Sequence, residues 1–299
     1  MGGLVVAIFG PTASGKSVVA EKLADLLPGE VVSADSMQVY RGLPLLTNQP
    51  ERLTRLVGIW DPDHSASVGE YQPLAHAAID EILRSGRIPV LAGGSGLYLR
   101  AALADLELPP PASPGRREHW QRLYDRVGGE RAHGLLAERD PAAAGTVHPN
   151  DRRRVVRALE LADVDESLAP ETDRLWADET RHPSVIFGLE VPREELLRRI
   201  EARTQAMFES GVEAEVAGAL AGPISPTARK ALGLEEIASL GRAEAIDAVN
   251  LRTRRYAAYQ RKWMRRIPGL VSVAADRPPG EVTDDILEMV RARERLPAR

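Results

Sequence analysis

The sequence predicts an α/β protein in which a mostly parallel β-sheet is flanked by helices and carries a small helical insertion domain. Three observations lead to this prediction. Short Val/Ile-rich runs alternate with helical periodicity, a glycine-rich motif joins the first run to the first helix, and a central stretch has helical signals alone. With 299 residues, 43% of them hydrophobic, the chain can bury a sizeable core.

Five apolar runs have the length and β-branched content of strands that are buried on both faces. They are residues 4–9, 30–34, 88–92, 185–189 and 270–273. Apolar residues at helical spacing follow the first run and recur over 74–83 and 194–208. Strands that alternate with helices imply a mostly parallel sheet with both faces covered.

Residues 10–17 read Gly-Pro-Thr-Ala-Ser-Gly-Lys-Ser, a complete phosphate-loop motif between a strand and a helix. In such a loop, backbone N–H groups surround a di- or triphosphate, Lys16 supplies a positive charge, and the hydroxyl of Ser17 holds Mg²⁺. The first strand, the loop and the first helix therefore predict a P-loop NTPase-like core. The motif does not distinguish among the phosphate compounds that such cores bind.

Two polar residues follow the ends of other predicted strands. Ligands bind outside the carboxyl ends of parallel strands, so we expect Asp35 and Ser95 to lie near the phosphate loop. Asp35 could bind Mg²⁺ or accept a proton from a nucleophile, and its structural alternative is a helix cap. Ser95 lies in a glycine-rich turn that opens a helix, where it could bind an anionic oxygen or simply cap the helix.

Arg203 lies at the edge of the apolar stripe formed by Leu196, Ile200 and Met207 on its predicted helix. A guanidinium in this place needs an anion, and the phosphate at the strand ends is the candidate. The alternative is an arginine whose aliphatic stem covers apolar surface.

Two basic segments are candidate nucleic-acid contacts: residues 151–157 and residues 252–266, the second of which contains no acidic residue. Tyr256, Tyr259 and Trp263 in the second segment have the spacing of core residues, so we expect them to pack inward while the arginines face outward. Phosphate contacts by six to ten of these charges would lower affinity by about 10³ to 10⁵ between 50 and 200 mM salt.

The stretch after 108–114, which contains four prolines, has helical signals and no convincing strand. We therefore expect three segments: a first part of the core at 1–112, a helical insertion at 113–182 that carries the first of the two basic segments, and the completion of the core with basic helices at 183–299.

Other classes of protein are disfavoured by composition. Zero cysteines exclude disulfides, cysteine-ligated zinc and thiol catalysis. No apolar run approaches the roughly 18 residues of a membrane span, and the first residues lack the pattern of a signal peptide. We therefore expect a cytoplasmic protein without membrane contact, and we expect it to act as a monomer. The net charge of −4 argues against indiscriminate nucleic-acid binding.

Five motifs in order along the chain resemble the tRNA dimethylallyltransferase (isopentenyltransferase) family. They are the phosphate loop at 10–17, Asp-Ser-Met-Gln-Val-Tyr-Arg-Gly at 35–42, Gly-Arg-Ile-Pro-Val-Leu-Ala-Gly-Gly-Ser-Gly-Leu-Tyr at 86–98, His-Pro-Asn-Asp at 148–151 with Arg-Ala-Leu-Glu at 157–160, and Met-Phe-Glu-Ser-Gly at 207–211 with Glu215 and Val216. The resemblance covers nearly the whole chain. It implies transfer of a dimethylallyl group from dimethylallyl diphosphate to N6 of the adenosine 3′ of the anticodon, with Mg²⁺ and with the adenine flipped out of the loop.

The resemblance also implies roles for particular residues. Asp35 would be the base for the N6 proton, and Ser95, in place of a usual threonine, would lie near the bridging oxygen together with Arg203. The diphosphate would be bound by Gly10, Thr12, Ala13, Ser14, Gly15, Lys16, Ser17 and Arg203, with Ser17 on Mg²⁺. The tRNA would be contacted by Asp35, Ser36, Gln38, Thr47, Arg154, Arg157 and Gln260.

The sequence departs from the family pattern in segments that line or support the RNA channel. The usual Gly-Thr-Ala-Lys-Pro reads Leu-Thr-Asn-Gln-Pro at 46–50, an expected histidine is missing around 55–61, a Gly-Tyr-Arg-Gln turn reads Gly-Leu-Glu-Glu at 233–236, and Lys-Arg-Gln reads Ala-Tyr-Gln at 258–260. These departures bear on the tRNA contacts more than on the chemistry.

Three alternative functions share some of these features. A small-molecule P-loop kinase would also place an aspartate at a strand end. An isopentenyltransferase acting on free adenine nucleotides would share the phosphate loop, but the insertion and the basic helix favour RNA. A non-catalytic RNA-binding protein would explain neither Asp35 nor the loop.

Overall fold

The computed structural model describes residues 3–110, 114–169 and 174–294. Contacts within the chain divide it into two compact units, one made of Met1–Asp105 with Leu175–Arg299 and the other of Leu106–Arg174. The segment boundaries expected from the sequence, 112/113 and 182/183, fall a few residues further along the chain. Each unit is described by itself.

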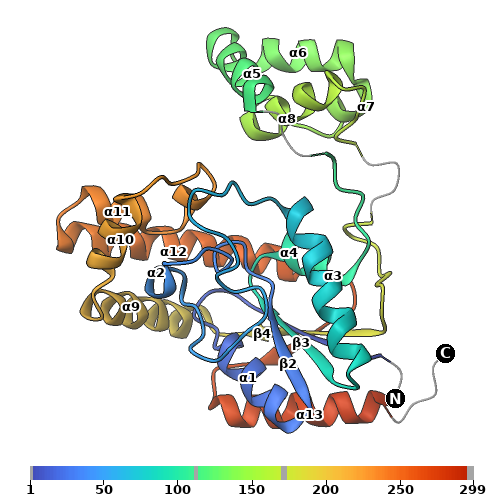
Figure 1. Ribbon diagram of the computed structural model, residues 1–299, viewed down its shortest axis with the longest axis vertical. Coiled ribbons are helices and arrows are strands. Elements are labelled where there is room, and N and C mark those ends of the chain that lie inside the picture. The colour runs from blue at the N-terminus through green and yellow to red at the C-terminus, as the bar shows by residue number, and fades with distance from the viewer. Residues whose placement is uncertain (1–2, 111–113, 170–173, 295–299) are drawn as a thin grey trace. The chain divides into compact units, whose positions relative to one another are not determined.

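The larger unit is built on a five-stranded sheet (Figure 1). The strands are β1 (Val5–Phe9), β2 (Gly29–Ser33), β3 (Ile88–Gly93), β4 (Ser184–Glu190) and β5 (Leu270–Ala274). Their order across the sheet is β2-β3-β1-β4-β5, and every neighbouring pair is parallel. The predicted α/β fold with a parallel sheet is confirmed, and all five strands lie where the apolar runs predict them.

Helices cover both faces of the sheet. Successive residues of each strand point to opposite faces, so each strand contributes side chains to two cores. Val6 and Ile8 of β1 belong to the core that includes α1 (Lys16–Leu26) and α13 (Pro279–Glu294), which lie side by side in Figure 1. Val5, Ala7 and Phe9 belong to the core that includes α3 (Val68–Arg84) and α4 (Gly96–Leu103). The first strand is thus completely buried.

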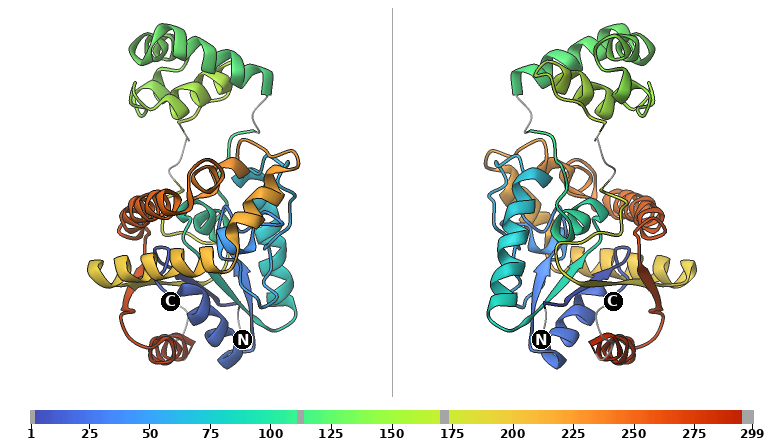
Figure 2. Two further views of the ribbon diagram at one scale, coloured as in Figure 1. Left: turned by 90° about the vertical axis from the view of Figure 1, so that its left-hand side faces the viewer. Right: turned by 90° about the vertical axis from the view of Figure 1, so that its right-hand side faces the viewer.

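The remaining elements of this unit surround the carboxyl ends of the strands (Figure 2). They are α2 (Pro44–Thr47), α9 (Arg193–Glu209), α10 (Val212–Leu220), the 3₁₀ turn η1 (Ala228–Lys230), α11 (Leu234–Ser239) and α12 (Arg242–Met264). The long helix α12 packs against α9 and α11. In the described part of the chain, no helix is long and apolar enough to cross a membrane.

The smaller unit is helical. It contains α5 (Pro114–Val127), α6 (Gly129–Arg139), α7 (Pro141–Ala144) and α8 (Arg152–Ala162). Its core is formed by Trp120, Leu136, Val155 and Leu159 with their neighbours, all less than 9% exposed. On α8, Val155 and Leu159 face this core, whereas Arg153 and Arg154 are exposed.

Candidate active site

The phosphate loop leaves the first turn of α1 open to an anion. Gly15, directly before the helix, has a φ of +87°, in the left-handed region that favours glycine, and offers no side chain to cap the helix. Gly10 is required by packing, because a Cβ there would lie 2.6 Å from Oγ of Ser14. Open N–H groups at the positive end of a helix dipole favour phosphate binding.

Asp35 and Ser95 lie on adjacent strand ends, because β2 pairs with β3. Close approach of these ends depends on Gly93, where a Cβ would lie 2.1 Å from the carbonyl oxygen of Ala34. Ser36 Oγ and Ser95 Oγ are 3.0 Å apart and share a hydrogen bond, which joins the two turns. The convergence expected from topology is therefore present.

Asp35 stabilises its own turn and lines the cavity, while its role in the chemistry stays a prediction. Its Oδ1 accepts a hydrogen bond of 2.9 Å from the N–H of Met37, as a capping carboxylate does. The residue also lines the cavity described below, together with Lys16 and Arg203. One carboxylate oxygen thus fixes the turn while the group remains available to a ligand.

Lys16 and Arg203 place two desolvated cations around the phosphate loop. The pKa of Lys16 is lowered to about 8, mainly by burial, with the charge of Asp35 opposing the shift and the charge of Arg203 adding to it. Burial also lowers the pKa of Arg203, again opposed by Asp35. Nη1 of Arg203 donates a hydrogen bond of 2.6 Å to Oγ1 of Thr12, so α9 is tied to the loop. A bound anion would favour the charged form of both groups.

These groups open into one cavity of about 400 Å³. Its polar end is formed by Thr12, Lys16, Ser17, Asp35 and Arg203. Six apolar side chains form another part of its wall, beside further polar residues such as Gln38, Thr253 and Tyr256: Met37, Leu46, Ile200, Met207, Leu232 and Val249. The cavity can therefore hold a ligand that joins a charged phosphate group to a small apolar group.

Gln260 links the phosphate loop to the turn after β3. It is 2% exposed, its Oε1 accepts a hydrogen bond of 2.8 Å from the N–H of Thr12, and its Nε2 donates one of 2.9 Å to the carbonyl of Gly94. A Cβ on Gly94 would lie 2.1 Å from that Nε2, so glycine is needed here. The structure thus gives Gln260 a positioning role, and its tRNA contact stays a prediction.

Tyr256 is a cavity residue that sequence reasoning missed. It lies one turn before Gln260 on α12, and its hydroxyl forms hydrogen bonds with Ser95 and Gln260. Burial and the charge of Asp35 raise the pKa of this hydroxyl. The available signal was the helical spacing of Thr253, Tyr256 and Gln260, polar groups that share the buried side of a basic helix.

The predicted tRNA contacts Ser36, Gln38 and Thr47 also line the cavity. Gln38 is 9% exposed and donates a hydrogen bond of 2.7 Å to the carbonyl of Asn48, and Thr47 Oγ1 donates one of 2.7 Å to the carbonyl of Leu43. Their side chains therefore hold the segment around α2 in place, and their contacts with tRNA stay predictions.

Glu215 fixes α2 from the other side and was given no role by sequence reasoning. Its two carboxylate oxygens each accept a hydrogen bond of 2.8 Å, from the N–H groups of Leu45 and Leu46. A carboxylate at the N-terminus of a helix satisfies open donors and complements the helix dipole.

Within the smaller unit, the two predicted tRNA contacts differ. Arg154 is exposed on α8, with no ion pair in the described part of the chain. Arg157 forms an ion pair of 3.1 Å with Glu160 and also donates a hydrogen bond to the carbonyl of Pro110. Arg154 is therefore the more available cation, and both contacts stay predictions.

The expectation for residues 252–266 is wrong for one aromatic residue. Tyr259 does not pack inward but is 54% exposed, whereas Tyr256 and Trp263 are partly buried. Two of the seven cations form ion pairs, Arg252 with Glu236 and Arg254 with Glu201. Acidic residues from α11 and α9, far away in the sequence, supply these partners.

Comparison with known proteins gives concordant results. Residues 38–267 match the family model described as IPP transferase. The chain is 39% identical to the tRNA dimethylallyltransferase of Salinispora arenicola, over 98% of this chain and 88% of that protein, and 40% identical to that of Streptomyces coelicolor, over 88% of both.

Solved structures show the same likeness. The tRNA isopentenylpyrophosphate transferase of Bacillus halodurans is 32% identical with a TM-score of 0.71, covering 97% of this chain and 96% of that one. The tRNA isopentenylpyrophosphate transferase of Staphylococcus epidermidis is 26% identical with a TM-score of 0.69, covering 97% and 99%. By its sequence and its fold, the chain belongs to the IPP transferase family.

Proposed function

We propose that this protein transfers a dimethylallyl group from dimethylallyl diphosphate to N6 of the adenosine 3′ of the anticodon in tRNA, giving N6-isopentenyladenosine. The observation that carries the proposal is the cavity in which the phosphate loop and Asp35 meet beside an apolar wall. Its relatives' names, tRNA dimethylallyltransferase, support the same reaction.

The cationic end of the cavity suits a diphosphate leaving group. When the allylic C1–O bond breaks, its electron pair leaves with the diphosphate, on which negative charge develops. Lys16, Arg203 and the N–H groups at the start of α1 are positioned to stabilise that charge. The apolar wall would hold the dimethylallyl group and exclude water from the reacting carbon.

Asp35 would act on the acceptor. N6 of the adenosine forms a bond to C1 of the dimethylallyl group, and the N6 proton passes to the Asp35 carboxylate. Ser95 and Tyr256, joined by a hydrogen bond, would orient the bridging oxygen and the acceptor on either side of that carboxylate. An exocyclic amine stacked in an anticodon loop must be flipped out to reach such a cavity.

The residues present fit a Mg²⁺ ion that is held mainly by its substrate. The described part of the chain has no group of three acidic or histidine side chains that could bind a metal alone. The Ser17 hydroxyl lines the cavity beside Lys16, and Mg²⁺ commonly combines one or two protein ligands with phosphate oxygens and water. When bound, Mg²⁺ would neutralise charge on the diphosphate.

We further propose that the protein works as a monomer in the cytoplasm, where its two substrates, tRNA and dimethylallyl diphosphate, would both be available. The exposed cations of α8 and α12 are the surfaces that would bind the anticodon stem-loop. Neither surface is needed by an enzyme that acts on free nucleotides.

The decisive experiment uses labelled dimethylallyl diphosphate, Mg²⁺ and either unmodified tRNA or AMP. We expect label in tRNA, at the adenosine 3′ of the anticodon after digestion to nucleosides. Label in AMP alone would indicate the nucleotide-specific isopentenyltransferase. Phosphoryl transfer from ATP without any use of dimethylallyl diphosphate would indicate a small-molecule kinase.

A further inference from the structure

Tyr259 is an aromatic residue that the proposed chemistry does not use. Its side chain is 54% exposed on α12, while other tyrosines, such as Tyr40 and Tyr71, are completely buried. No hydrogen bond to the Tyr259 hydroxyl is present within the described residues. An exposed ring without a polar partner is available for contact with another molecule.

The Tyr259 ring is the outer member of an aromatic series. Its centroid lies 6.5 Å from that of Trp263, edge to face, and Trp263 in turn lies 4.8 Å from Trp176. The guanidinium of Arg266 covers Trp176 at 3.8 Å. Tyr259 is therefore supported from one side by packed rings and remains open on the other.

This series is fixed to the catalytic turn. Trp263 packs against Gly96, where a Cβ would lie 2.2 Å from its ring, and Gly96 directly follows Ser95. The backbone on either side of Trp176 is held by the buried guanidinium of Arg100, which donates hydrogen bonds to the carbonyls of Leu175 and Ala177. The rings that Tyr259 contacts are thus packed against the turn that carries Ser95.

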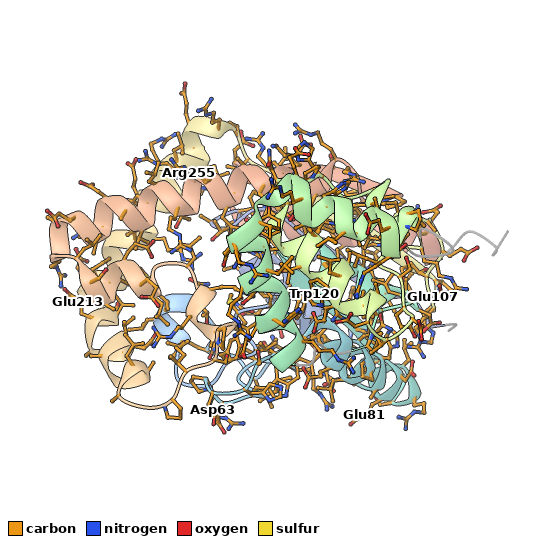
Figure 3. All side chains as sticks on the ribbon, turned by 90° about the horizontal axis from the view of Figure 1, so that it is seen from above. Asp63, Glu81, Glu107, Trp120, Glu213 and Arg255 are labelled. Atoms are coloured by element: carbon orange, nitrogen blue, oxygen red, sulfur yellow. The ribbon has the colours of Figure 1, made fainter. Side chains whose placement is uncertain are left out.

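Tyr259 is also next to the opening of the cavity. Tyr256 and Arg255, three and four residues earlier on the same helix, both line that cavity. Residues three and four apart share one side of a helix. Figure 3 shows Arg255 projecting from α12 beside α9. If the base of one nucleotide entered the cavity, the neighbouring nucleotides of the RNA would lie over this surface.

The cations around Tyr259 are not neutralised. Arg255, Arg261, Lys262 and Arg265 have no carboxylate within ion-pair distance in the part of the chain that the structure describes. Arg252 and Arg254, at the start of the same segment, are the ones paired with glutamates. Arg255 and Lys262, four residues before and three residues after Tyr259, therefore place unpaired positive charge on its side of α12.

We propose that Tyr259 is a stacking platform for an unpaired base of the RNA substrate, next to the adenosine that is modified. Exposed aromatic rings among cations are how proteins hold single-stranded nucleic acid, with the ring on a base and the cations on phosphates. This assignment rests on the proposed function. It adds that this protein uses an aromatic ring at position 259, where the Lys-Arg-Gln of the family pattern has its arginine.

The experiment measures binding of an unmodified anticodon stem-loop RNA to the whole protein at several salt concentrations. Loss of one base–aromatic stack in Tyr259→Ala is expected to weaken binding about 5- to 150-fold, and Tyr259→Phe is expected to restore it. The slope of log affinity against log salt should not change in Tyr259→Ala, because no charge is lost. Arg265→Gln should reduce that slope by about 0.7 to 0.9.

Leu251→Ala is the matched control, since Leu251 is 48% exposed on the same helix, eight residues before Tyr259, and carries neither a ring nor a charge. Wild-type affinity in Tyr259→Ala would overturn the proposal. So would equal weakening in Tyr259→Phe, which would show that the hydroxyl and not the ring makes the contact. These outcomes are distinct from failure of the proposed function, in which wild-type protein would transfer no label to tRNA at all.

Discussion

The two ends of the catalytic region are built in opposite ways. At the phosphate end, Thr12 is held by Arg203 through its side chain and by Gln260 through its backbone, so three distant segments are cross-linked before any ligand binds. On the RNA side, Tyr259 and Arg265 are exposed and have no ion pair or hydrogen bond among the described residues. Mutually bonded groups around the phosphate loop thus contrast with an open surface on α12.

This difference predicts which property each substitution should change, the rate of the chemical step or the affinity for RNA. Changes at the phosphate end should lower the rate of the chemical step, because preorganised donors stabilise charge in the transition state. Changes on the open surface should alter affinity for RNA and its salt dependence. Each prediction below tests one end against the other.

The largest effect is expected from Lys16→Ala. Removing the ammonium that faces the developing diphosphate charge should lower kcat/KM by about 10³ to 10⁴. Single-turnover transfer of labelled dimethylallyl groups to tRNA measures it. Lys22→Ala, which removes an exposed lysine from the same helix α1, is the matched control. Equal losses in both variants would contradict a specific role for Lys16.

Asp35→Asn should have a smaller effect, a fall of about 10² in the single-turnover rate, because a positioned base contributes about 10² to 10⁴. Asparagine keeps the Oδ1 that accepts the hydrogen bond from Met37, so the turn is preserved. RNA affinity should stay near that of wild type. Asp284→Asn, on the exposed side of α13, is the control. A rate equal to wild type would remove Asp35 from the role of base.

Gln260→Ala tests the hydrogen bonds by which this side chain joins the phosphate loop to the turn after β3. Leaving the buried N–H of Thr12 without an acceptor should lower the free energy of unfolding by about 2 kcal/mol and kcat/KM by about 30-fold. Thermal unfolding and the KM for dimethylallyl diphosphate measure the two effects. Gln205→Ala removes an exposed glutamine from α9 and should change neither. Weakened RNA binding with an unchanged KM for the diphosphate would instead favour the tRNA contact.

These residues also show how far the sequence could predict the site. The phosphate loop is read from contiguous residues, and strand topology was enough to bring Asp35 and Ser95 to the same edge. Gln260 and Thr12 are 248 residues apart, and their hydrogen bond depends on how α12 crosses the sheet. The spacing of residues along α12 does not show where that helix lies relative to the phosphate loop. The same reason explains why Tyr256 and Glu215 were missed.

The fold was more predictable than the surface. Buried parallel strands are marked by continuous β-branched runs, which is why all five were found. The direction of the Tyr259 side chain was predicted wrongly. Helical spacing indicates which residues share a side of α12, but it does not show which of them pack against another element. Arg252 and Arg254 were counted among the candidate phosphate contacts, although glutamates on other elements pair with them. Whether a surface arginine is free or paired with a carboxylate depends on tertiary contacts.

The smallest effect expected is a pH dependence confined to the phosphate end. Burial lowers the pKa of Lys16 to about 8, so the free protein loses this positive charge as the pH rises through 8. Affinity for inorganic diphosphate should fall about tenfold from pH 7 to pH 9, with proton uptake on binding near pH 8. Isothermal titration in buffers of different ionisation enthalpy measures both, and Lys16→Met should abolish the proton uptake. Stem-loop affinity should not follow this titration, because the cations around Tyr259 are arginines and a surface lysine; a parallel fall would mean that the two ends are coupled.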